Sequence, residues 1–404
     1  MQKKNWPNFK PDLIAKVINV LKSGKINYTQ GRYGRIFEKN FSNFVGNKHS
    51  VAICNGTAAL EIAIKSLKLP EKSEIMVTAR SFFSSASCIV NTGNIPIFLD
   101  VDLKTQNIFI EDIKKKITKK TKAIICVHLA GLPCPMIEIM KFSKKNNIKI
   151  IEDCSQAHGA SINGKQVGSF GDVATWSFCT DKIISTLGEG GMLSTNKKNI
   201  YQFASRYINH GAVNTKKSTS PEKFIYNKNY FGSNYRITEI QALAGLHQLK
   251  SLNKVQKKRE KMARGFHKVV NKFDNYLYAY FPSENIKCAW YRFYFFIKKH
   301  LKNKSVLRSK IITELKKQNV ICFTGSCPEI YLEKAFQNLK NFKKKRLNNC
   351  KLLGYSSIAL DVNHTLSNDV HKVNLIKINK VLQGILKKNE CTNYGRSRTH
   401  LFCN

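Results

Sequence analysis

Residues 171–196, GDVATWSFCTDKIISTLGEGGMLSTN, hold a lysine between two apolar runs and beside a glycine cluster. The run at 173–178 is rich in β-branched and aromatic residues and predicts a buried strand. Lys182 follows within a turn, then the glycines at 188–191 and a second short strand at 192–195. Lysine is rarely fully buried. Lys182 is therefore either an ordinary surface residue or an amine whose pKa is lowered by desolvation, so that it acts as a Schiff-base nucleophile.

A carboxylate stands at the end of an apolar strand upstream of this lysine. The strand at 148–152 leads into Asp153, and small and polar residues follow as far as Ala160. Ligands of open α/β sheets collect at the carboxyl ends of strands. A pyridoxal phosphate site requires such a pair, because the aspartate keeps the pyridine nitrogen protonated and the lysine holds the aldehyde. The two stretches together therefore favour the reactive lysine over the surface one.

Four motifs in this chain resemble those of the DegT-type nucleotide-sugar aminotransferases, a family of fold-type-I pyridoxal phosphate enzymes. SFCTDKIISTLGEGG at 177–191 is close to the family's cofactor-lysine motif, and EDCSQAHGA at 152–160 to its pyridine-nitrogen motif. NGTAAL at 55–60 and GSNYRITEIQALAGLHQL at 232–249 match two more, in the family's order. The resemblance runs from about residue 6 to about residue 385, nearly the whole chain.

The resemblance implies an α/β fold with a large and a small domain. The large domain, expected at residues 1–250, would hold a mostly parallel seven-stranded sheet flanked by helices. The alternation of strand and helix patterns through residue 196 favours the same arrangement. A smaller α+β domain is expected at 251–386, followed by a polar tail at 387–404 that we expect to be disordered. The polar stretch at 214–228 predicts a mobile loop.

The resemblance also implies a role for each of nine residues. Lys182 would form the Schiff base and, once freed, carry a proton between the substrate's Cα and the cofactor's C4′. Asp153 would pair with the ring nitrogen and Gln156 with the ring hydroxyl. Ser155 would lie under the ring, on the face opposite Phe82. The cofactor phosphate would be bound by Thr57, Ala58 and Ser177 of the same chain and by Asn234 of the other subunit of a homodimer.

For some of these residues, the local sequence pattern alone is equally consistent with a purely structural role. Thr57 could be an ordinary helix N-cap. Phe82 would serve equally as a core aromatic, and Asn234 as a turn residue before the helix expected at 238–249. The resemblance, and not the local pattern, assigns them to the cofactor. No metal site is expected.

The resemblance implies that L-glutamate donates the amine to a nucleotide-linked 4-keto-6-deoxysugar, dTDP- or GDP-linked, for surface-polysaccharide synthesis. A sugar dehydratase of the same fold is a rival, although such relatives carry histidine where this chain has Lys182. An amino-acid aminotransferase would need an arginine for a second carboxylate, and the sequence does not exclude one. Thr29, Arg80 and Trp290 depart from the family's usual residues, with consequences for substrate choice that the sequence leaves open.

The net charge of +42, from 68 Lys and Arg against 26 Asp and Glu, would attract polyanions. A nucleic-acid-binding regulator without catalysis is thus a third rival. The lysines occur in short runs along the whole chain, which is typical of solvated helix faces, so we do not expect a nucleic-acid partner. The 12 cysteines show neither CxxC nor zinc spacing. With no apolar run of membrane-spanning length and no signal-peptide core, we expect a cytoplasmic protein without a membrane partner.

Overall fold

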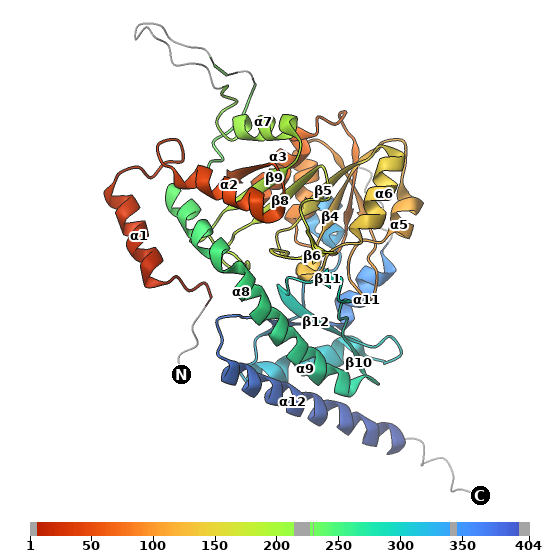
Figure 1. The fold of residues 1–404 in the computed structure, drawn as a ribbon. Coiled ribbons are helices and arrows are strands. Elements are labelled where there is room, and N and C mark those ends of the chain that lie inside the picture. Colours follow the sequence, from red (N-terminus) through yellow and green to blue (C-terminus); the bar gives the residue numbers. More distant parts are fainter. Residues whose placement is uncertain (1–5, 214–226, 229, 340–345, 396–404) are drawn as a thin grey trace, which may run out of the picture.

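The computed structural model describes residues 6–213, 227–228, 230–339 and 346–395 (Figure 1). Most of the loop expected at 214–228 lies outside the described residues. Within these ranges the chain forms two apolar cores, each built around its own sheet, and one long helix that contributes to both.

A seven-stranded sheet is the centre of the larger part. Its strand order is β1-β9-β8-β5-β4-β2-β3. The strands β2, β3, β4, β5 and β8 run parallel to one another, whereas β9 pairs antiparallel with both β1 and β8. This confirms the mostly parallel seven-stranded sheet. The strands are β1 (His49–Ile53), β2 (Glu74–Thr78), β3 (Ile95–Leu99), β4 (Thr121–Val127), β5 (Lys149–Asp153), β8 (Val173–Ser177) and β9 (Gly191–Thr195).

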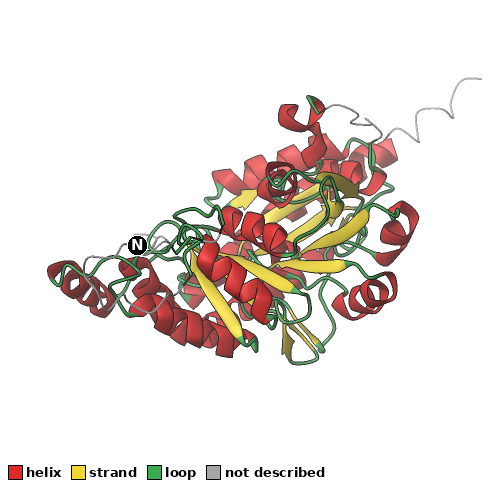
Figure 2. Ribbon diagram, turned by 90° about the horizontal axis from the view of Figure 1, so that it is seen from above, coloured by secondary structure: helices red, strands yellow, loops and turns green. Residues whose placement is uncertain are grey.

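Helices cover both faces of this sheet (Figure 2). Because successive strand residues point to opposite faces, Ile75 and Val77 of β2 join one core layer and Met76 joins the other. The layer of Ile75 and Val77 packs against α3 (Gly56–Ser66), α4 (Ser84–Asn91) and α7 (Lys198–Tyr207). The opposite face is covered by α2 (Tyr33–Val45), α5 (Ile110–Lys116), α6 (Met136–Asn146) and the first half of α8 (Glu239–Val270).

The smaller part is built on a four-stranded antiparallel sheet in the order β10-β12-β14-β13. Its core includes residues from the second half of α8 and from α9 and α12. The elements are β10 (Leu277–Tyr278), β12 (Arg292–Ile297), β13 (Cys322–Phe323), β14 (Ser357–Asp361), α9 (Lys304–Lys317), α11 (Asn348–Ser356) and α12 (Asn368–Gly395).

Helix α8 is one continuous helix, Glu239–Val270, and extends well beyond the helix expected at 238–249. Leu246 in its first half packs with α2, and Met262 and Phe266 in its second half pack with the small sheet. We therefore propose that the domain boundary expected near residue 250 lies inside α8. At the other end, α12 continues through Gly395, into the segment expected to be a polar tail, and residues 396–404 lie outside the described residues.

The remaining elements are short or peripheral. Helix α1 lies beside α8 (Figure 1), with Leu13 and Val20 packed against Leu243 and Ala244. In the described part of the chain, no helix is long and apolar enough to span a membrane. The other elements are α1 (Pro11–Lys22), α10 (Lys334–Gln337), the 3₁₀ helices η1 (Leu129–Gly131), η2 (Asn271–Phe273) and η3 (Ile330–Leu332), and a three-stranded sheet of β6 (Ser161–Ile162), β7 (Lys165–Gln166) and β11 (Ile286–Lys287).

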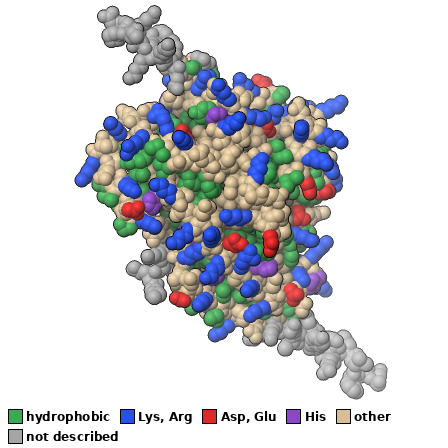
Figure 3. Space-filling model, viewed as in Figure 1, with side chains coloured by type: hydrophobic (Ala, Val, Ile, Leu, Met, Phe, Trp, Pro, Cys, Tyr) green, Lys and Arg blue, Asp and Glu red, His purple; other side chains and the backbone are tan. Residues whose placement is uncertain are grey.

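The positive charge is distributed over the face of the molecule that Figure 3 shows. Figure 3 shows Lys and Arg side chains spread across the visible face among neutral residues. They do not gather there into a single band.

Candidate active site

A cavity of about 830 Å³ opens where the strands of the large sheet end. Val127, Asp153 and Ser177, the last residues of β4, β5 and β8, line it. This is the position at which open α/β sheets bind ligands. The small sheet forms the opposite wall through residues that include Arg292, Tyr294, Phe323 and Ala359.

The structure brings most of the predicted site residues together in this cavity. The residues that line it are Thr57, Ala58, Phe82, Asp153, Ser155, Gln156, Ser177 and Lys182. Asn234 does not line the cavity of its own chain. It is exposed and forms an isolated backbone bridge with Asn209.

The Asp153 carboxylate is buried and held by two serines. Its Oδ2 accepts a hydrogen bond from Ser85 Oγ at 2.9 Å. Its Oδ1 accepts from Ser155 Oγ at 2.6 Å and from the Ser155 backbone N–H at 3.2 Å. With only 4% of its surface exposed, the carboxylate has a defined direction toward the cavity. Ser85 is a supporting residue that the sequence motifs did not reveal.

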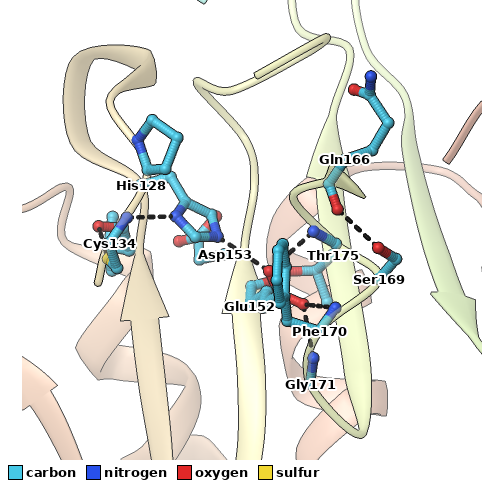
Figure 4. A network of polar contacts seen from close by, with 12 residues as sticks. His128, Cys134, Glu152, Asp153, Gln166, Ser169, Phe170, Gly171 and Thr175 are labelled. Carbon is cyan, nitrogen blue, oxygen red and sulfur yellow. Dashed lines mark hydrogen bonds and ion pairs between the residues drawn. The ribbon is translucent and has the colours of Figure 1, made fainter. Parts of the chain in front are cut away.

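The neighbouring Glu152 fixes the strand end on which Asp153 stands (Figure 4). Its two carboxylate oxygens accept hydrogen bonds of 2.7–2.8 Å from backbone N–H groups of the 168–171 loop. Its Oε2 also lies 3.2 Å from His128 Nε2. Since the Cys134 N–H donates to His128 Nδ1 at 3.0 Å, the ring proton is on Nε2 and is donated to Glu152. The network is structural and anchors β5 to β4 and to the loop.

Three possible metal ligands lie in this network, His128, Glu152 and Cys154, with ligand atoms within 4.8 Å of one another. Both nitrogens of His128 and both oxygens of Glu152 are already engaged in hydrogen bonds. Burial also raises the pKa of the Cys154 thiol well above its usual range, and a thiol must be deprotonated to bind a metal. The cluster is therefore explained by the hydrogen bonds that it makes.

The start of α3 forms an anion-binding cradle beside Ser177. A Cβ on Gly56 would lie 2.8 Å from the Ser177 Cβ, so only glycine allows the helix to begin this close to the end of β8. First-turn N–H groups have no partner inside a helix and favour anions. Asn55 Oδ1 accepts one of them, from Ala58, at 2.8 Å. Thr57 and Ser177 add hydroxyl groups, so the cradle fits a phosphate, with the Ala58 N–H already in use.

Lys182 lies at the meeting point of the two domains. Its Nζ is 3.1 Å from Asp181 Oδ2 and 5.1 Å from the centre of the Tyr291 ring, and its side chain is 17% exposed. The Tyr291 hydroxyl donates to the same Asp181 oxygen. Although burial alone would raise it, the pKa of Asp181 is lowered by the charge of Lys182 and the hydrogen bond from Tyr291. Asp181 is therefore an ionised partner that holds the amine in place.

Phe82 and Gln156 complete a slot for a flat ring. Phe82 is 66% exposed although it is a large aromatic, so its alternative role as a core residue is wrong. Gln156 Oε1 accepts the Ala130 N–H at 2.7 Å, which orients the amide and leaves its NH₂ group as a donor. An exposed ring on one wall and an oriented amide at the edge are what a pyridine ring with a hydroxyl substituent would contact.

The residues that depart from the family pattern lie outside this cavity. Thr29 is exposed and bonds to Asn27. Arg80 is 1% exposed and donates to Gln106 at 2.9 Å. Trp290 belongs to the core of the small domain. The departures therefore do not remove any group from the cofactor slot.

Tyr291 and Arg292 are cavity residues that the motifs did not assign. Both come from β12 or the residue before it, and they meet Asp181 only after the small domain packs against the large one. Tyr291 is separated from Asp181 by 110 positions, so no local pattern connects them. The aromatic run at 290–297 is typical of a strand, and its pattern does not indicate a site.

Comparison with known proteins agrees with this geometry. Residues 7–375 match the model of the DegT/DnrJ/EryC1/StrS aminotransferase family. An uncharacterized protein of Methanocaldococcus jannaschii is 32% identical over 92% of this chain and 96% of its own length. The GDP-perosamine synthase of Escherichia coli O157:H7 is 36% identical over 66% of this chain and 71% of its own. A solved aminotransferase structure from Psychrobacter cryohalolentis has a TM-score of 0.90 at 38% identity, covering 95% of this chain and 99% of that one.

The family match includes the strand ends, the lysine turn and nearly all of the small domain. The cavity supplies an amine, a buried carboxylate, an exposed aromatic ring and a phosphate cradle, which together fit pyridoxal phosphate. The chain therefore belongs to the DegT/DnrJ/EryC1/StrS aminotransferase family and is a pyridoxal-phosphate-dependent aminotransferase.

Proposed function

We propose that this aminotransferase moves an amino group from L-glutamate to a nucleotide-linked keto-6-deoxysugar, at the 4-keto carbon of a dTDP- or GDP-linked sugar. The observation that carries the proposal is the presence of Lys182 and Asp153 in one cavity of about 830 Å³, which leaves room for a substrate beside the cofactor. The name of the Escherichia coli relative, GDP-perosamine synthase, supports a nucleotide-linked sugar. The product would serve surface-polysaccharide synthesis in the cytoplasm.

In this proposal, residues of the chain bind and orient the cofactor, and one of them also transfers a proton. Lys182 would hold the cofactor and, once released, would carry a proton between the substrate's Cα and the cofactor's C4′. Asp181 keeps the amine close to the reacting atoms through its contact of 3.1 Å. Asp153 would hold the ring nitrogen, where its fixed negative charge would favour the protonated ring. Pyridoxal phosphate, when bound, supplies the ring that accepts the electrons of the broken Cα–H bond.

The other predicted residues position the ring and its phosphate. Phe82 and Ser155 would lie on opposite faces of the ring, and the Gln156 amide would donate to the ring hydroxyl. Thr57 and Ser177, with the start of α3, would bind the phosphate, and Ala58 would share its N–H between the phosphate and Asn55.

We further propose a homodimer in which Asn234 completes the partner's site. Asn234 is exposed and lies outside the cavity of its own chain, in the segment that leads to α8 at Glu239. An exposed amide there is free to reach a phosphate held by a second subunit. A ligand from the same chain would have to line the cavity, which Asn234 does not.

Two of the three rival functions are weaker on specific grounds. A dehydratase relative would carry histidine in place of Lys182, and this chain keeps the lysine. A regulator without catalysis would not need an ionised Asp181 beside an amine, or a buried carboxylate held by two serines. An amino-acid acceptor would need an arginine in the cavity; Arg292 meets that requirement, so the choice of acceptor is decided by the assay below.

The test is a two-stage assay on the purified protein reconstituted with pyridoxal phosphate. Addition of L-glutamate should shift the visible absorption band of the bound cofactor. A panel of dTDP-, GDP- and UDP-linked ketosugars should then restore the band and consume L-glutamate continuously. Consumption with a 2-oxo acid but with none of the sugar nucleotides would refute the proposed acceptor.

A further inference from the structure

A second cavity, of about 410 Å³, adjoins the active-site cavity inside the small domain. The two cavities share three lining residues, Asp181, Arg292 and Phe323. Arg292 is the first residue of β12, so a short strand of the small sheet carries it into the wall between the two spaces. No part of the proposed cofactor slot uses this guanidinium.

The Arg292 guanidinium donates hydrogen bonds to the described residues through only one of its three nitrogens. Its Nη1 donates to Asp361 Oδ1 at 2.6 Å and to the Tyr291 carbonyl at 3.2 Å. The guanidinium carbon lies 4.5 Å from the centre of the Tyr291 ring and 5.2 Å from that of Phe323. Neither Nε nor Nη2 donates a hydrogen bond to any residue in the part of the chain that the structure describes. Two aromatic rings and one carboxylate thus fix the position of the Arg292 guanidinium, and its Nη2 is still free to donate a hydrogen bond to a ligand.

The surroundings of Arg292 carry more positive than negative charge. Arg259 of α8 lies beside the pair and donates to the backbone carbonyls of Trp290 and Tyr291 and to His364, all at 2.9–3.1 Å. None of these partners is a carboxylate. Burial lowers the pKa of Arg259 to about 10, so it remains a cation at neutral pH. Three cations, Arg292, Arg259 and Lys182, thus face two carboxylates, Asp361 and Asp181. One positive charge is left that an incoming oxyanion would balance.

The reacting amine and this guanidinium lie against the same aromatic ring. Lys182 Nζ and the Arg292 guanidinium both contact the Tyr291 ring, at 5.1 and 4.5 Å from its centre. An amino donor has to place its amino-bearing carbon at Lys182, and its carboxylates are only one to three carbon atoms away from that carbon. The phosphates of a sugar nucleotide lie beyond a whole sugar ring. We propose that Arg292 binds a carboxylate of the amino donor, an inference that rests on L-glutamate as the proposed donor.

The experiment measures each half of the reaction separately on the holoenzyme. Rapid mixing with L-glutamate gives the apparent dissociation constant and limiting rate of the donor half, and glutarate, which has no amine to transfer, reports binding alone by calorimetry. Arg292→Gln should weaken both L-glutamate and glutarate by about tenfold to a hundredfold, the usual effect of one charge-assisted hydrogen bond. The limiting rate and the acceptor half should change far less.

Two further variants separate this role from a structural one. Arg264→Gln is the matched control, because Arg264 also pairs with a carboxylate, Glu260, and lies 4.9 Å from an aromatic ring, but lines neither cavity. It should leave both constants unchanged. The double change Arg292→Gln with Asp361→Asn removes both members of the ion pair. It keeps the test available if the single variant is unstable, and the same weakening is expected.

The possible outcomes are distinguishable. Unchanged glutarate and L-glutamate affinity in Arg292→Gln would refute the inference. A change confined to the acceptor half would also refute it, because the oxyanion would then be the phosphate of the sugar nucleotide. If the wild-type enzyme reacts with L-glutamate but aminates no nucleotide-linked ketosugar, the proposed acceptor is wrong, while the weakened donor half would still support Arg292.

Discussion

At the residue scale, the account depends on the state of a few side chains that share one cavity. Asp153 is oriented by Ser85 and Ser155, and Lys182 by Asp181 and Tyr291. Each functional group therefore has a second group that restricts its direction. Such support matters because a reacting group that is misplaced by 1 Å loses much of its effect.

The Asp153 carboxylate tests this directly. Asp153→Asn should keep the fold and still bind pyridoxal phosphate, because the amide has nearly the same shape. Turnover should fall by about a hundredfold or more, the order of magnitude for the loss of one electrostatic stabiliser. Steady-state rates with saturating L-glutamate and acceptor, together with circular dichroism, give the comparison. Wild-type turnover in this variant would mean that the strand-end carboxylate is only structural.

Lys182 and Asp153 are predictable from the sequence because Asp153 ends one apolar strand and Lys182 lies in the turn after another. The polar end of such a strand reaches the ligand edge of the sheet. The sequence does not predict the roles of three other residues, because these roles arise from contacts between distant segments. They are Ser85, Tyr291 and Arg292. Phe82 is intermediate. Its position was foreseen from the resemblance, but only its exposure of 66% separates a ring-contacting residue from a core residue.

At the scale of elements, the junction of α3 and β8 determines whether a phosphate can bind. Gly56 meets Ser177 so closely that no side chain fits between them. The fold as a whole was predictable to this level because strand and helix patterns alternate regularly through residue 196. The continuity of α8 was not, since the polar residues Gln256 and Arg259 interrupt its buried stripe and its two halves pack into different cores.

Gly56→Ala should weaken cofactor binding without unfolding the protein. The new Cβ would lie 2.8 Å from the Ser177 Cβ and push the helix start away from the cradle. We expect the dissociation constant of pyridoxal phosphate, measured by spectroscopic titration, to rise by about tenfold or more, as for the loss of a charge-assisted hydrogen bond. Gly384→Ala is the control, because its Cβ would meet nothing within 4 Å and alanine favours a helix. Equal affinity in both variants would exclude a phosphate site at α3.

The contact between α2 and β1 gives the protein a pH-dependent stability. Burial raises the pKa of Glu38 from 4.5 to about 7, although the hydrogen bonds from Ala52 and Tyr28 and the charge of Arg35 oppose the shift. The folded state thus holds this proton more tightly than the unfolded chain. The stabilisation from Glu38 is therefore full below about pH 4.5 and is lost as the pH rises to about 7.

Glu38→Gln should remove this dependence. The amide keeps an acceptor for the Tyr28 hydroxyl and the Ala52 N–H, but it never ionises. Relative to wild type, the melting temperature of the variant should therefore be several degrees higher at pH 8, as expected for a change of a few kcal/mol in a protein of this size. The difference should shrink toward pH 5. A constant difference at all pH values would show that Glu38 titrates normally.

At the scale of the whole molecule, the active site lies between two packed cores, and the proposed dimer adds a third component. The cavity takes its chemistry from the ends of the large sheet and its far wall from the small sheet. A single chain leaves Asn234 outside this cavity. The proposed enzyme is therefore complete only when two chains combine.

Subunit mixing tests this architecture. Lys182→Ala should be inactive, and Asn234→Asp strongly impaired because its charge repels the cofactor phosphate. If Asn234 acts across the interface, a mixed dimer has one site with both substitutions and one site with neither. Activity should then reappear when the two variants exchange subunits. If exchange is demonstrated, for example by mass spectrometry of tagged chains, and no turnover returns, Asn234 does not belong to the partner's site.

The central claim is that Lys182, among the many lysines of this chain, holds the cofactor. The most direct measurement is reduction of the reconstituted protein with borohydride, followed by proteolysis and mass spectrometry. We predict loss of the visible absorption band and a single phosphopyridoxyl modification, on the peptide that contains Lys182. A modification on another lysine, or none at a stoichiometric level, would contradict the account.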